Sequence, residues 1–365
     1  MKRFLLALLA ALTLAAICTQ PACAYDIASE QAEAFGTAAL ESALPAQTYD
    51  AFGTLTVADA AHPRPLLQKL WDYALREGGG ALASAARNAA LLLAVVFLAA
   101  LCASLSASGA CAKVTQMTGA VAVAALSVTH VTSCITAGSN ALTTLRDFSK
   151  ILLPSMCAAA AASGAATSAA AKYAATSLFL DILLSAETAV LLPMLYTYAG
   201  TVICGAALEQ DVLTALSALL RKALRLLLIG FAAVFTLYLS LTGILTGSAD
   251  AAAAKAVKTA VSAALPVVGS IVADAAATVT ASAAILRGGI GIIGVMSVAA
   301  VCVTPYLQLA VHYALYKLAA GIAESFADKR VGRLIGGFAD VYGMVGVASL
   351  ILFLSIVSSM KAVTG

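Results

Sequence analysis

Charged residues are scarce in this sequence. Only 11% of its 365 residues are Asp, Glu, Lys or Arg, whereas 62% are hydrophobic, and the mean hydropathy is +0.98. A soluble globular chain carries about 25% charged and about 45–50% apolar residues. The composition is therefore that of a membrane protein, and its dispersed basic residues form no cluster typical of a nucleic-acid site.

Signatures of catalysis and of metal binding are missing as well. The chain has three histidines without a zinc motif, and it lacks both G-x-S-x-G and a Walker A lysine loop. Residues 289–294 match G-x-G-x-x-G, but an alanine-rich helix precedes them where a dinucleotide site needs a strand, so we interpret the glycines as helix-packing positions. We predict a protein that is not an enzyme, with no catalytic residue, cofactor or metal.

The eight cysteines form no disulfide framework. They show no C-x-x-C spacing, two lie in the amino-terminal segment, and the others are scattered through apolar stretches. We expect them to be small buried hydrophobic residues.

The amino-terminal part is typical of an exported segment. Residues 1–24 have a basic start, an apolar run and an A-x-A site at 22–24, which predicts a cleaved signal peptide. Residues 25–87 carry eight acids and four bases. An amphipathic helix is expected over 64–77, followed by a glycine hinge at 78–80. This segment has few large apolar residues, so we expect it to dock onto the membrane domain or onto a partner.

Residues 88–365 are predicted to form a polytopic membrane domain. The fold class is all-α, with about six spans and with broken or re-entrant helices. Between spans we expect a polar linker at 139–150 and basic cytoplasmic segments at 206–225 and 312–340. A second crossing within 151–205 would invert the orientation of every later span. The distribution of basic residues favours a single net crossing of this segment. The expected spans are 89–107, 114–137, one net crossing in 151–205, 226–246, 289–311 and 341–360.

The stretch 250–294 is the part of the chain around which these spans are arranged. It is too polar for a comfortable span, and a proline and a glycine interrupt it. Charges near a membrane interior are expensive, so they either pair to hold helices in register or line a wet passage. The candidate functional residues are the charged and helix-breaking residues of this stretch, together with two acids from an apolar run earlier in the chain. They are Asp250, Lys255, Lys258, Pro266, Gly269, Asp274, Arg287, Asp181 and Glu187.

Within this stretch the chain resembles the stage III sporulation protein AE family. The resemblance is carried by Asp250, the bases Lys255 and Lys258, the block 266–269, Asp274 and Arg287, together with the layout of signal peptide, exported segment and polytopic domain.

The resemblance implies a multi-pass protein of the mother-cell membrane that surrounds the forespore, with its amino-terminal segment on the exported side. It implies a component of the secretion-like channel complex that links the two cells and is needed for late forespore gene expression. The partners implied are the other proteins of the same sporulation operon, including a secretion-type ATPase and ring-forming membrane proteins, and a forespore membrane protein. From the residues alone, a self-contained secondary transporter or permease for a small solute stays open.

Overall fold

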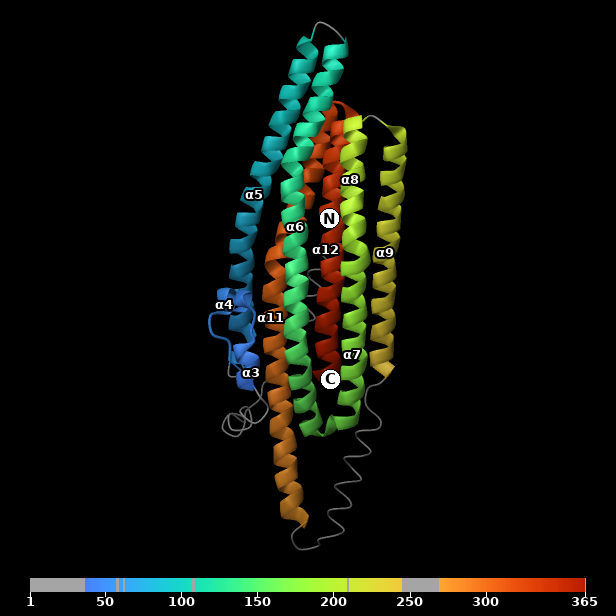
Figure 1. The fold of residues 1–365 in the computed structure, drawn as a ribbon. Coiled ribbons are helices and arrows are strands. Elements are labelled where there is room, and N and C mark those ends of the chain that lie inside the picture. The colour runs from blue at the N-terminus through green and yellow to red at the C-terminus, as the bar shows by residue number, and fades with distance from the viewer. Residues whose placement is uncertain are drawn as a thin grey trace.

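The described part of the chain is almost wholly helical in a computed structural model (Figure 1). It comprises residues 37–56, 59–61, 63–106, 109–208, 210–244 and 269–364. No strand occurs in these ranges, so the all-α prediction is confirmed. The predicted signal peptide 1–24 and four candidate residues, Asp250, Lys255, Lys258 and Pro266, lie outside the described residues.

Long helices run side by side along one bundle. In chain order the elements are α3 (Thr37–Ser42), α4 (Ala46–Phe52), the 3₁₀ turn η1 (Asp59–Ala61), α5 (Pro63–Leu105), α6 (Gly109–Ala160), the π-helical segment η2 (Ala161–Ala165), α7 (Ala166–Ala186), the π-helical segment η3 (Glu187–Leu191), α8 (Leu192–Leu208), α9 (Asp211–Ile244), α11 (Gly269–Phe326) and α12 (Lys329–Thr364). In Figure 1, α5 rises, α6 descends, α7 and α8 rise, α9 descends, α11 rises and α12 descends. α8 thus continues α7 in the same direction, and every other long helix is antiparallel to the one that precedes it.

Close packing of small residues holds the bundle together. α12 packs against α11, α6, α8 and α9, and α5 packs along α11 and α6. A Cβ atom added at Gly337 of α12 would lie 2.6 Å from the Val202 side chain of α8, and one at Gly343 would lie 2.9 Å from the Tyr313 ring of α11. Such close approach at glycine is typical of helix packing in membranes.

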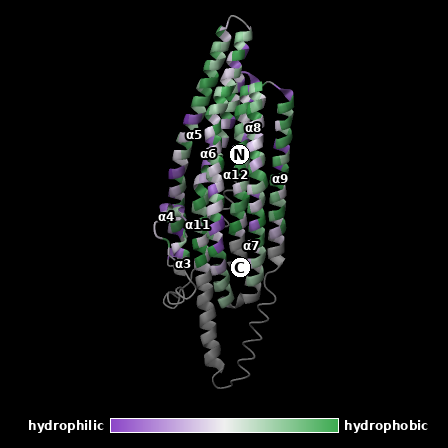
Figure 2. Cartoon of the chain, viewed as in Figure 1, coloured by the Kyte–Doolittle hydropathy of each residue, from purple (hydrophilic) through white to green (hydrophobic). Residues whose placement is uncertain are grey.

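Five described helical stretches are long and apolar enough to cross a membrane. They are Arg64–Leu105, Gly109–Ser163, Tyr173–Leu208, Gly288–Phe326 and Lys329–Ser358, and hydrophobic residues predominate along them (Figure 2). The predicted span 226–246 lies on α9 and extends past the described residues, and it is not among the five. The transmembrane-helix character is thus confirmed, while the sixth crossing stays a prediction.

Two expected helix boundaries are wrong. The glycine hinge expected at 78–80 lies inside α5. The basic segment 206–225 is not a separate helix, because α9 begins at Asp211 and continues past Arg225 into the apolar residues that follow. Glycine costs about 1 kcal/mol relative to alanine inside a helix. Contacts of α5 with α11 offset that cost here. A Cβ atom added at Gly78 would lie 3.7 Å from the Leu307 side chain of α11.

The polar linker expected at 139–150 is also helical and belongs to α6. Leu142, Leu145 and Phe148 in this segment are buried in the bundle core. Its charged residues lie on the opposite, exposed face, where Lys150 pairs with Asp147 at 3.0 Å. The segment is therefore amphipathic, and its buried face keeps the helix continuous.

The segment 151–205 is divided at η2, where the chain reverses direction (Figure 1). Pro154 lies inside α6 and does not end that helix. After η2 the chain returns through a single candidate span, Tyr173–Leu208, which contains the second π-helical segment, η3. This arrangement matches the single net crossing that the distribution of basic residues favoured. The number of membrane crossings stays a prediction.

The described residues of the segment 25–87, which the sequence predicts to be exported, pack against the helical bundle. α4 packs against α11 and α5, and the Lys69 ammonium donates a hydrogen bond to the Phe52 carbonyl at 3.2 Å. Thr304 of α11 lies 2.9 Å from the Tyr73 hydroxyl and donates a hydrogen bond to Glu77 at 3.2 Å. Described residues of 46–87 thus contact α11, while the division into an exported segment and a membrane domain stays a prediction.

Candidate functional site

The stretch 250–294, which holds most of the candidate residues, is described only from Gly269 onward. Gly269 is the first residue of α11, which continues without interruption to Phe326. Asp274 and Arg287 lie on the first part of this helix, where the structure describes the backbone but not the side chains. The two roles that the sequence leaves open for these charges, pairing between helices and lining a wet passage, therefore stay predictions.

Asp181, the first of the two candidate acids in the apolar run, pairs at the surface. Its carboxylate lies 3.1 Å from the Arg146 guanidinium, and the two side chains are 62% and 45% exposed. The pair joins α7 to α6. Exposed ion pairs contribute about 0–1 kcal/mol, so Asp181 acts in helix pairing and does not line the described interior.

Glu187, the second acid, is fully buried. Its side chain is 0% exposed, and neither carboxyl oxygen has a hydrogen-bond partner among the described residues. It lies on the inward face of the α7–α8 crossing, at the same helical spacing as the buried Leu183, Leu191 and Leu195. Glu187 is also the first residue of the π-helical segment η3, and π-helical segments occur frequently at functional sites.

A third acid, Asp340 on α12, was not a candidate, and it forms two ion pairs in the interior of the bundle. It is 8% exposed and accepts hydrogen bonds from Arg221 of α9 at 3.0 Å and from Lys317 of α11 at 2.8 Å. The hydrogen bond to Asp340 raises the pKa of the Arg221 guanidinium above its usual value, so the arginine stays ionised. One carboxylate thus connects three helices.

These three residues were missed because they lie in segments that we interpreted as basic cytoplasmic loops. Asp340 stands 119 residues from Arg221 and 23 from Lys317 in the sequence, and no periodic pattern links such distant positions. One signal was present: Asp340 is a single acid between apolar residues that the structure buries, such as Phe338 and Tyr342. An isolated charge in an apolar run calls for a partner.

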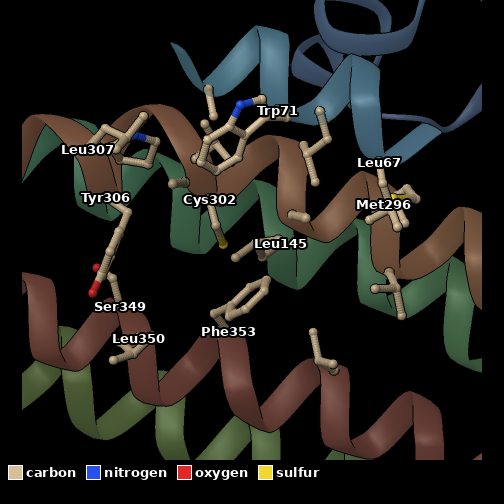
Figure 3. Close-up of a pocket in the computed structure, with 18 of the residues that line it drawn as sticks. Leu67, Trp71, Leu145, Met296, Cys302, Tyr306, Leu307, Ser349, Leu350 and Phe353 are labelled. Atoms are coloured by element: carbon tan, nitrogen blue, oxygen red, sulfur yellow. The ribbon is translucent and has the colours of Figure 1, made fainter. Parts of the chain in front are cut away.

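An apolar cavity of about 280 Å³ lies between α5, α6, α11 and α12. Figure 3 shows Trp71 and Leu67 of α5 facing Met296 and Cys302 of α11, with Phe353 of α12 below them. Its lining is almost entirely hydrophobic, so it offers packing and no acid–base chemistry. In the described residues no group of three His, Cys, Asp or Glu side chains is placed to hold a metal ion.

Comparisons with known proteins agree with one another. The model of the stage III sporulation protein AE family matches residues 62–363. The stage III sporulation protein AE of Bacillus subtilis strain 168 is 24% identical over 236 residues, which are 64% of this chain and 59% of that protein. The chain thus matches less than two thirds of the length of that relative. No solved structure matches the chain.

Proposed function

Because the chain belongs to the stage III sporulation protein AE family, we propose that it is a membrane component of the secretion-like channel complex that links the mother cell and the forespore. Its role is to support late forespore gene expression from the mother-cell membrane around the forespore, with the amino-terminal segment on the exported side. Its partners are the secretion-type ATPase and ring-forming membrane proteins of the same operon, and a forespore membrane protein.

The observation that carries this proposal is the continuous apolar core of the bundle. Buried hydrophobic residues form one cluster that extends from Leu40 to Val357 and includes every long helix. The interior ion pairs of Asp340 connect helices to one another. Packing of this kind supports a wall-forming or anchoring subunit, and a wide passage would then form between this chain and other chains.

The hairpin of α5 and α6 gives further support. Its tip extends beyond the ends of the other helices in Figure 1. Large apolar side chains toward this end of α5 are exposed, including Leu98 at 58% and Leu105 at 76%. Apolar surface of this extent needs lipid or another protein to cover it, which suits a subunit of a membrane assembly.

A secondary transporter for a small solute is the alternative, and Glu187 is the observation that favours it. An ionisable group within a membrane helix that faces the bundle interior marks an ion or substrate pathway in many transporters. Glu187 has no partner in the described residues, so helix pairing does not account for it.

Reconstitution distinguishes the two functions. The full chain is placed in liposomes loaded with fluorescent solutes of graded size, alone and together with the other products of its operon. A channel subunit is expected to release solute only when the partners are present. Saturable transport of a small solute by the chain alone would overturn the proposal in favour of the transporter.

A further inference from the structure

A cavity of about 450 Å³ opens between α8, α9, α11 and α12 at the end of the bundle where α11 connects to α12. All four helices contribute to its wall, and Asp340 with its two cationic partners forms part of it. We call it the basic cavity. Its charged residues are Arg221, Lys317, Arg330, Arg333, Glu324 and Asp340.

The basic cavity has more positive than negative charge, with four cations against two carboxylates. Asp340 does not cancel its partners' capacity to bind a ligand. It engages one nitrogen of Arg221 and the single nitrogen of Lys317, whereas a guanidinium carries five N–H donors and an ammonium three. Both cationic side chains are about two-fifths exposed, at 43% and 40%, so their remaining donors are accessible from the cavity.

The shape of the basic cavity leaves room for a ligand. Gly321 of α11 lines it, and a Cβ atom added there would meet no other atom within 4 Å. At two other glycines of the wall the neighbouring side chains lie close, because a Cβ at Gly337 would collide with Val202 and one at Gly332 would collide with the Glu324 side chain. The space at Gly321 is therefore open, while α12 lies in close contact with α8 and α11 beside it.

The surroundings of the cavity indicate a lipid as the source of the ligand. Exposed apolar side chains lie on the two helices that flank it: Leu216 at 40% and Leu219 at 63% on α9, and Leu318 at 63% and Ile322 at 40% on α11. A phosphate group bound between these helices would leave acyl chains along apolar surface. Basic pockets between membrane helices bind the headgroups of anionic lipids.

We propose that the basic cavity binds the phosphate-bearing headgroup of an anionic phospholipid, with its acyl chains lying on α9 and α11. The arginines supply bidentate hydrogen bonds to phosphate oxygens, and Asp340 positions Arg221 and Lys317 for this contact. The ligand would fix the ends of four helices to the membrane surface. This inference does not depend on whether the chain is a channel subunit or a transporter.

The test measures lipid binding to the full chain in detergent by native mass spectrometry. Phosphatidylglycerol and cardiolipin are titrated, with phosphatidylcholine as the neutral reference. We expect at least tenfold tighter binding of one anionic lipid. The Arg330→Gln/Arg333→Gln variant should weaken it about tenfold or more, since each basic residue near a lipid surface contributes about 1 kcal/mol.

A matched variant, Lys222→Gln/Arg225→Gln, removes the same charge from exposed residues of α9 that do not line the cavity. It should change the affinity less than twofold. Gly321→Leu should block binding because its side chain fills the open space, while Gly321→Ala should keep most of the binding. Circular dichroism checks that the variants keep their helix content.

Two outcomes would overturn the proposal. The first is equal retention of phosphatidylglycerol by the wild type and by the Arg330/Arg333 and Gly321→Leu variants. The second is a site for a soluble anion: inorganic phosphate at millimolar concentration displaces the lipid from the wild type, and anionic lipids bind no tighter than phosphatidylcholine. Failure of the liposome experiment above would leave both lipid measurements unaffected.

Discussion

Replacing Glu187 by methionine is expected to stabilise the protein. The carboxyl group is 0% exposed and has no hydrogen-bond partner among the described residues. Mutational data place the cost of burying an unpaired polar group at about 1–3 kcal/mol. Methionine is unbranched and apolar, and it adapts to irregular space in a core, so Glu187→Met should remove this cost while filling the same volume between Leu183 and Leu191.

The matched control is Glu187→Gln, which keeps two polar atoms in the same place. Its amide stays unpaired, so its free energy of unfolding should lie within about 1 kcal/mol of the wild type. The methionine variant should gain about 1–3 kcal/mol. At about 2.1 cal/mol/K of unfolding entropy per residue, 1 kcal/mol corresponds to about 1.3 °C in Tm for a chain of 365 residues, so a rise of about 1–4 °C is expected.

Thermal unfolding in detergent can be followed with a thiol-reactive dye. Cys134 is buried and reports unfolding, whereas Cys102, Cys111 and Cys204 are exposed and are first replaced by serine. A methionine variant that is less stable than the wild type by more than 1 kcal/mol would refute the reasoning, because it would mean that the carboxyl group makes a favourable interaction. If the variant is more stable but fails to support sporulation, Glu187 is kept for function at a cost in stability.

Three further predictions concern the interior ion pairs, the packing of α12 on α8 and the helix break predicted at Pro266. Asp340→Asn should lower the free energy of unfolding by about 1–3 kcal/mol, which is less than for a fully buried ion pair because the cationic partners of Asp340 are partly exposed. Asp181→Asn at the surface should change the free energy of unfolding by at most about 1 kcal/mol. Both are read from the thiol assay, and equal effects would contradict the assignment of Asp340 to the interior. Gly337→Ala should destabilise by about 1–3 kcal/mol through overpacking against α8, whereas Gly230→Ala, which has open space, should be neutral or stabilising by up to about 1 kcal/mol. Pro266→Ala should reduce spore counts at normal protein level, because it restores a helix hydrogen bond where the sequence predicts a break, and unchanged counts would count against that break.

Composition and periodicity predicted what depends on local sequence. The membrane-helix character follows from long apolar runs, and the amphipathic stretch 64–77 follows from apolar residues at helical spacing. The continuity of α5 through 78–80 could not be predicted in this way. Glycine weakens a helix locally, and contact with α11 decides the outcome, which is a tertiary effect. The same holds for α6 at 139–150, where buried Leu145 and Phe148 keep a polar segment helical.

The ion pairs of Asp340 show a second kind of limit. A sequence shows that an acid stands in an apolar run, but its partner is set by which helices become neighbours. Nothing in the local sequence of Arg221 and Lys317 distinguishes them from other basic residues such as Lys222 and Arg225. Helix packing brings the first two to Asp340.

The structure also sharpens the choice between charges that pair helices and charges that line a passage. Asp181 and Asp340 are both acids in or beside apolar runs, and both have cationic partners on a neighbouring helix. Helix pairing accounts for them without any passage. Glu187 has the same sequence context as Asp181, six residues away, yet it faces the core and has no partner in the described residues. An uncompensated carboxyl group in such a place persists only if it is neutral or if another group meets it in some state of the protein. Glu187 is therefore the acid whose substitution separates a purely structural bundle from one that moves an ion.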